Sequence, residues 1–131
     1  MPRESRDPAY LSDMLSAAEA VVRFVAGRTF AELLGDEMMR ASVERKIEII
    51  GEAARRVTEA CQAAHPEIEW RKIIATRHIF AHDYDEIDYE VVWRIATVHA
   101  PALAAQLRAV LAALPKEQSD GGGLAPAGGS K

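Results

Sequence analysis

The stretch from Arg77 to Tyr84 carries a guanidinium, two imidazoles, a carboxylate and a phenol within eight positions, at the end of an otherwise apolar run. Imidazole side chains donate and accept protons near neutral pH, and His78 and His82 supply two of them. The guanidinium of Arg77 presents a fixed fork of N–H donors that matches the oxygens of a phosphate. Together these side chains predict acid/base chemistry at a phosphodiester.

The same residues are also compatible with two other interpretations. His78 and His82 are four positions apart, and on an α-helix this spacing allows two imidazoles to bind one zinc ion. No further Glu or His follows at a spacing that completes such a site, so we assign no metal ligand and no cofactor. In the other interpretation, Arg77 and the histidines only satisfy buried polar groups at a helix end.

The angular spacing of these residues predicts that the site is shared between two chains. On a continuous α-helix Arg77 and Tyr84 are nearly eclipsed, whereas Arg77 and His82 diverge by roughly 140°. Both reach one phosphate if the helix ends near Ala81, so that His82 turns back, or if a second chain contributes across a two-fold axis. We therefore expect a homodimer.

Apolar residues recur at spacings of three and four through most of the chain, which is typical of α-helices, and no strand pattern is evident. Four long helices and a short one, joined by short connections, predict an all-α, antiparallel bundle of four to five helices. The expected helices span residues 8–25, 30–34, 36–64, 67–81 and 89–114.

Individual residues predict where these helices end and what approaches them. Gly51 interrupts the longest helix at a cost of about 1 kcal/mol relative to Ala, which indicates that another backbone comes close to it. We expect Cys61 to be an apolar filler and His99 to be a packed core or interface residue. The other signals are a stop at Gly27, a Thr29-x-x-Glu32 capping box, a break at His65-Pro66, a cap at Asp88 and a bend at Pro101.

The composition is that of a globular chain of one domain, which we place at residues 1–114. Residues 115–131 hold five of the eight glycines and no apolar periodicity, so this tail is predicted to be disordered. Cys61 is the only cysteine, which favours a reducing, cytoplasmic setting. The polar N-terminus lacks a signal peptide, and we expect no apolar run near the roughly 20 residues of a membrane span.

The net charge of −4 and the pI of about 5.6 count against extensive binding along a nucleic-acid backbone. Three basic pairs, Arg45-Lys46, Arg55-Arg56 and Arg71-Lys72, still allow a confined and salt-sensitive contact with RNA. The alternative is that these pairs are solvated helix faces balanced by nearby carboxylates, those of Glu48, Glu52 and Glu59.

The run Arg77-x4-His82-x-Tyr84 matches the Arg-x4-His-x-Tyr signature of the HEPN superfamily, and the chain resembles the HepT-type toxins of toxin-antitoxin pairs. The resemblance covers residues from about Asp7 to Leu114. Its further blocks are Tyr10–Met14, Ile49–Ala54, Pro66–Ile73 and Asp88–Trp93.

This resemblance implies an all-helical HEPN bundle that dimerises so that two motifs meet in a cleft, and a metal-independent endoribonuclease that acts by attack of the ribose 2′-hydroxyl. His82 is then the general acid/base, Arg77 binds the scissile phosphate and His78 supports them. Tyr84 is the residue that a minimal nucleotidyltransferase antitoxin adenylylates, in a type VII-like pair. The alternative is a non-catalytic dimeric subunit that serves as binding partner and modification target of the nucleotidyltransferase.

Overall fold

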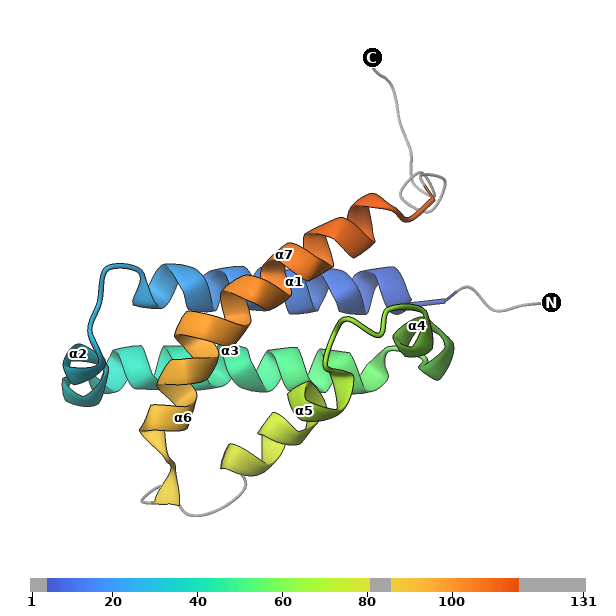
Figure 1. Ribbon diagram of the computed structural model, residues 1–131. Coiled ribbons are helices and arrows are strands. Elements are labelled where there is room, and N and C mark those ends of the chain that lie inside the picture. The colour runs from blue at the N-terminus through green and yellow to red at the C-terminus, as the bar shows by residue number, and fades with distance from the viewer. Residues whose placement is uncertain (1–4, 81–85, 116–131) are drawn as a thin grey trace.

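The computed structural model describes residues 5–80 and 86–115, and this part of the chain is helical with no strand, which confirms the predicted all-α class. Two long antiparallel helices, α1 and α3, lie side by side, and α7 crosses over them (Figure 1). The α-helices are α1 (Asp7–Val25), α2 (Phe30–Gly35), α3 (Glu37–Arg56), α4 (Glu59–Ala64), α5 (Trp70–Ala75), α6 (Tyr89–Arg94) and α7 (Ala100–Ala112).

The corner between α1 and α3 is built as its sequence predicts. Gly27 adopts a φ of 72°, a left-handed conformation that glycine adopts without a steric penalty, and ends α1. The capping box is present, because Glu32 N donates to Thr29 Oγ1 at 3.0 Å and Thr29 N donates to Glu32 Oε1 at 2.8 Å. Asp36 then caps α3 by accepting from Met39 N at 3.0 Å.

The predicted single helix over residues 36–64 is wrong, because the chain breaks between α3 and α4. The buried carboxylate of Asp7 accepts hydrogen bonds from Thr58 N at 2.9 Å and from Thr58 Oγ1 at 2.6 Å. In a continuous helix Thr58 N would donate to Ala54 O, so Asp7 competes directly with the helical bond. The side chain of Gln62 compensates by donating to Ala54 O at 3.3 Å.

Two clusters of buried apolar residues hold the bundle together. The first joins the amino-terminal half of α1, the end of α3 and α7, and the second joins the end of α1, the start of α3 and α6. The largest fully buried side chains are Leu11, Met14, Leu33, Ile47, Ile68, Leu107, Val21, Val43 and Val92. The core therefore lies along the α1–α3 pair and leaves α5 on its flank.

The last helical run is split before Pro101, where a bend or a split was predicted, by a π-helical turn, η3 (Ile95–His99). Pro101 has no N–H to donate to Thr97 O, and Ala100 N donates instead to Ile95 O, five residues back. The wider turn places Ala100 in the core and leaves His99 exposed. His99 is therefore not a core residue of the bundle, and the alternative expectation, that it lies at an interface, stays a prediction.

The run from Tyr89 to Ala112 is 24 residues long and meets the length and composition criteria for a membrane span. This corrects the expectation that no run approaches that length. Some of its apolar side chains, Val92, Leu103 and Leu107 among them, are buried in the bundle, whereas Val98 is exposed. A helix inside a bundle meets the same criteria, so the finding is weak support for membrane insertion.

Candidate active site

Arg77 and His78 lie on a 3₁₀ segment, η1 (Thr76–Phe80), that continues directly from α5. The transition is set by Thr76, whose backbone N–H and Oγ1 both donate to Ile73 O, the hydroxyl at 2.6 Å. This i−3 contact tightens the chain from 3.6 to about 3.0 residues per turn. Both Arg77 and His78 are exposed on it.

The predicted α-helix over residues 67–81 is therefore wrong at both ends. Its helical part begins at Trp70, and from Thr76 the step per residue is about 120° instead of 100°. The angular argument for a shared site assumed a continuous α-helix, so its numbers do not hold beyond Ala75. His82 and Tyr84 lie outside the described residues, and their positions stay predictions.

The apolar residues of η1 anchor it to the bundle. Ile79 and Phe80 are half-buried and pack against the second core cluster, together with Ile87, Tyr89 and Trp93. Because these two side chains turn inward, their neighbours Arg77 and His78 face solvent. The local sequence thus separates an anchoring pair from a polar pair.

The end of α5 and the start of η1 approach α3 closely at Gly51, as the sequence predicted. A Cβ atom at Gly51 would lie 3.2 Å from Ile73 O, 3.2 Å from Thr76 Oγ1 and 3.5 Å from Arg77 Cγ. The absence of a side chain lets the end of α5 and the start of η1 rest on α3. Gly51 therefore positions the backbone that carries Arg77.

Replacing Gly51 by alanine is expected to destabilise the protein, although alanine is the better helix former by about 1 kcal/mol. The new methyl group would meet a backbone carbonyl and a hydroxyl already engaged with it, and such overpacking costs about 1–3 kcal/mol. We expect a net loss of about 1 kcal/mol of unfolding free energy in urea denaturation, and slower RNA cleavage because Arg77 shifts.

Gly35→Ala is the matched control, because a Cβ at Gly35 has no atom within 4 Å and Gly35 does not adopt a positive φ. It is expected to be neutral or slightly stabilising. Equal stability of the two variants would contradict the proposed role of Gly51.

A hydrogen bond that the sequence did not predict holds α6, the helix after the motif, against α3. The hydroxyl of Tyr89 donates to Glu44 Oε2 at 2.6 Å, and the Arg40 guanidinium lies 5.8 Å from the centre of the Tyr89 ring. Burial, and then the hydrogen bond to Glu44, raise the pKa of Tyr89. The partners are 45 positions apart, so no local pattern signals their pairing.

The described surroundings of Arg77 contain little that would pair with its guanidinium. None of the described carboxylates lies within ion-pair distance of Arg77. The described residues contain no cluster of three or more His, Cys, Asp or Glu side chains that could hold a metal ion.

Burial, and then the negative charge of Asp7, raise the pKa of Cys61, which fits its predicted role as a filler.

A cavity of about 440 Å³ lies between α3, α5 and α7, with Thr76 in its lining. Its floor is apolar, formed by residues such as Ile47, Ile50, Ile73 and Leu103. Arg77 and His78 are not among its described lining residues, so this cavity does not gather the predicted chemistry. The candidate site is instead the open surface at η1.

Comparison with known proteins places this geometry in a family. Residues 14–110 match the family model described as Ribonuclease HepT-like. A protein from Methanocaldococcus jannaschii, provisionally named an RNase, is 31% identical over 78% of this chain and 94% of its own length. The protein named probable ribonuclease HepT from Thermococcus cleftensis is 33% identical over 79% of this chain and 92% of its own.

A third relative, provisionally named an RNase, from Caldanaerobacter subterraneus, is 26% identical over 78% of this chain and 91% of its own length. No solved structure shows significant similarity to the chain. The family match covers most of the bundle and includes the stretch from Arg77 to Tyr84. The chain belongs to the HepT-like ribonuclease family, which confirms the predicted resemblance.

Proposed function

We propose that this protein is a metal-independent endoribonuclease whose reacting groups are Arg77 and His82. The observation that carries the proposal is the exposed Arg77, seated on Gly51 at the start of the Arg-x4-His-x-Tyr motif, inside the region that matches the ribonuclease family. The curated relatives named as ribonucleases support the same reaction class.

In the proposed reaction the ribose 2′-hydroxyl attacks the adjacent phosphorus. His82 takes the hydroxyl proton as the new P–O bond forms, and protonated His82 then gives that proton to the 5′-oxygen as the bond from phosphorus to this oxygen breaks. Arg77 binds the phosphate oxygens and stabilises the negative charge that develops on them. General acid/base catalysis is worth about 10²- to 10⁴-fold, and a preorganised cation about 10²- to 10³-fold.

His78 has a supporting role in this proposal. It is exposed next to Arg77 on η1, where its imidazole is accessible to the RNA backbone. It can donate a hydrogen bond to a phosphate oxygen and share in proton transfer. We place no metal and no cofactor in the reaction.

We further propose that the protein works as a homodimer in the cytoplasm and as the toxin of a toxin-antitoxin pair. Two copies of the motif then form one cleft for RNA. Its partner is a minimal nucleotidyltransferase antitoxin that transfers AMP from ATP to the hydroxyl of Tyr84, with release of pyrophosphate. The added phosphate places negative charge where the RNA phosphate binds.

A second candidate function is a non-catalytic subunit that only binds the nucleotidyltransferase and is modified by it. The net charge of −4 favours this candidate, because it opposes binding of RNA. AMP transfer to Tyr84 is common to both functions, so a mass measurement does not separate them. RNA cleavage by the unmodified protein does.

The test is incubation of purified, unmodified protein with RNA in the presence and absence of EDTA. We expect cleavage in both conditions at the same rate, with 2′,3′-cyclic phosphate and 5′-hydroxyl ends on the products. Loss of cleavage with EDTA would contradict the metal-independent mechanism. No cleavage in either condition would favour the non-catalytic subunit.

A further inference from the structure

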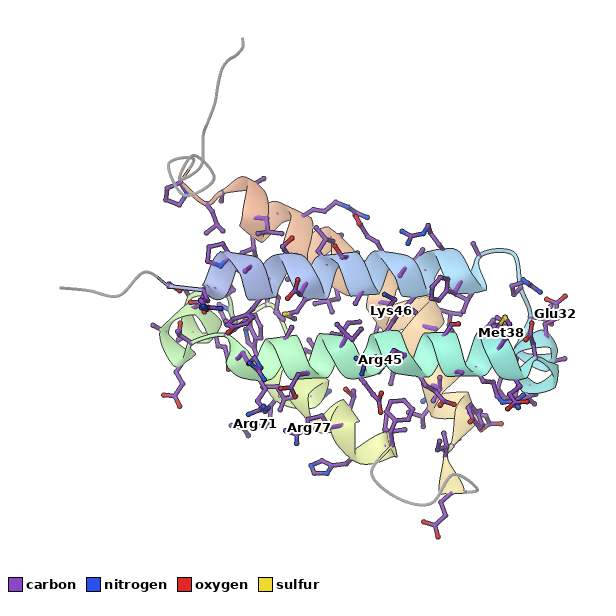
Figure 2. The ribbon with its side chains drawn as sticks, turned by 180° about the vertical axis from the view of Figure 1, so that it is seen from behind. Glu32, Met38, Arg45, Lys46, Arg71 and Arg77 are labelled. Carbon is purple, nitrogen blue, oxygen red and sulfur yellow. The ribbon has the colours of Figure 1, made fainter. Side chains whose placement is uncertain are left out.

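One side of α3 and the adjoining segment carry a row of arginines. Seen from behind the bundle, Arg45 on α3, Arg71 on α5 and Arg77 on η1 appear on one face (Figure 2). Arg56 lies eleven positions, or about three turns, from Arg45 and so shares its side of α3, and Arg55 is the residue before it. We call this row the arginine strip, and its members are Arg45, Arg55, Arg56, Arg71 and Arg77.

The carboxylates within the strip do not neutralise it. Glu52 accepts hydrogen bonds from both Arg55 Nη2, at 2.7 Å, and Arg56 Nε, at 3.0 Å, so one carboxylate serves two guanidinium groups. Glu48 lies 3.8 Å from Arg45, and their side chains are 44% and 70% exposed. Such an exposed, long ion pair contributes little and leaves the arginine available.

Arg71 and Arg77 form no ion pair with the described carboxylates. Among the described residues, the five arginines of the strip pair with two carboxylates, those of Glu48 and Glu52, which serve Arg45, Arg55 and Arg56. The chain as a whole has a net charge of −4, so this row of arginines differs in charge from the chain average. Its exposed guanidinium groups match phosphate oxygens in shape and charge.

We infer that the arginine strip binds the sugar-phosphate backbone of the RNA strand beside the scissile bond. The inference rests on the proposed function, which places a phosphate at Arg77, and the strip continues from that residue. From Arg45 to Arg55 the strip follows α3 for about 15 Å, which is long enough to pass several phosphates. Its contacts are with phosphates alone, so they position RNA without reading its sequence.

The test compares the double variant Arg45→Gln/Arg71→Gln, and each single variant, with the parent. The probe is a mixed-sequence, 2′-O-methylated RNA oligonucleotide, which binds but lacks the attacking hydroxyl. Each lost phosphate contact lowers the slope of log Kd against log salt by about 0.7 for a single strand. We expect a lower slope by about 1.4 in the double variant, and binding at least about tenfold weaker at low salt.

Arg108→Gln is the matched control, because Arg108 is also an exposed helical arginine with one exposed carboxylate partner, Glu19, at 3.2 Å. It lies on α7, which pairs with α1 outside the strip. We expect its affinity and its salt slope to equal those of the parent. Cleavage of unmethylated RNA by all the proteins is measured alongside.

The outcomes separate the strip from the proposed function. If the parent cleaves RNA and the double variant has the salt slope of Arg108→Gln, the proposed RNA-binding role of the strip is wrong, and the proposed ribonuclease activity is supported. If the parent binds the probe through the strip and cleaves no RNA, the proposed ribonuclease activity is wrong, and RNA binding by the strip is supported. Failure of the parent to bind the probe, or an effect of the double variant on a protein partner alone, overturns the strip.

Discussion

Replacing His82 by alanine is expected to reduce RNA cleavage by about 10²- to 10⁴-fold, because the reaction loses the group that moves protons to and from the ribose and the leaving oxygen. Binding of RNA should change little, since Arg77 and the arginine strip, the proposed phosphate contacts, are unchanged. The rate is measured in single-turnover assays, and the oligomeric state by size-exclusion chromatography with light scattering. We expect the variant to have the same oligomeric state as the parent.

His99→Ala is the control for this measurement, since His99 is another exposed histidine and lies on η3, outside the Arg-x4-His-x-Tyr motif. Its cleavage rate should equal that of the parent. His78→Ala is expected to fall between the two, because His78 only supports the reaction. A His82→Ala protein that cuts RNA as fast as the parent would remove His82 from the mechanism.

Adenylylation of Tyr84 is expected to abolish cleavage, because the added phosphate repels the RNA phosphate and the adenosine fills the space beside it. Tyr84→Phe keeps the ring and lacks the hydroxyl that receives AMP. We expect this variant to remain active after incubation with the nucleotidyltransferase and ATP, under conditions that silence the parent. Intact mass and cleavage rate are measured on the same samples.

Tyr89→Phe is the matched control, since Tyr89 is a half-buried tyrosine whose hydroxyl is engaged by Glu44. It should gain AMP and lose activity as the parent does. Modification of Tyr84→Phe to the same extent as the parent would show that another residue receives AMP. Full cleavage by the modified parent would show that modification has another purpose.

Much of the fold follows from local signals in the sequence. The stop at Gly27, the capping box at Thr29 and the cap at Asp88 are all present, because each depends on residues within three positions of one another. The all-α class follows from periodicity for the same reason. Local hydrogen-bonding geometry is the part of a structure that sequence spacing encodes directly.

The features that were predicted wrongly depend on contacts between residues far apart in the sequence, or on the backbone N–H donor that proline lacks. The break after α3 needs Asp7, 51 positions from Thr58. The exposure of His99 needs the π-helical turn before Pro101, which shifts the core position to Ala100. Spacing alone contains neither piece of information.

The candidate site was predicted in part. The close approach at Gly51 was expected from its cost to the helix, and α5 and η1 do rest there. The 3₁₀ turn was not expected, because it depends on the bond from Thr76 Oγ1 to Ile73 O, which competes with the α-helical pattern. The assumption of a continuous α-helix beyond Ala75 was therefore wrong, whereas the positions of His82 and Tyr84 relative to Arg77 stay predictions.

The hydrogen bonds between Asp7 and Thr58 also have a consequence for synthesis on the ribosome. Asp7 at the start of α1 can form these hydrogen bonds only after 51 further residues have been made. The start of the chain therefore lacks this contact while the α1–α3 hairpin is being synthesised. Contacts between residues so far apart in the sequence form late, because the chain loses entropy in closing the intervening loop before the contact stabilises it. The anchor between α1 and the end of the α1–α3 hairpin can therefore form only after Thr58, two residues beyond α3, has been made.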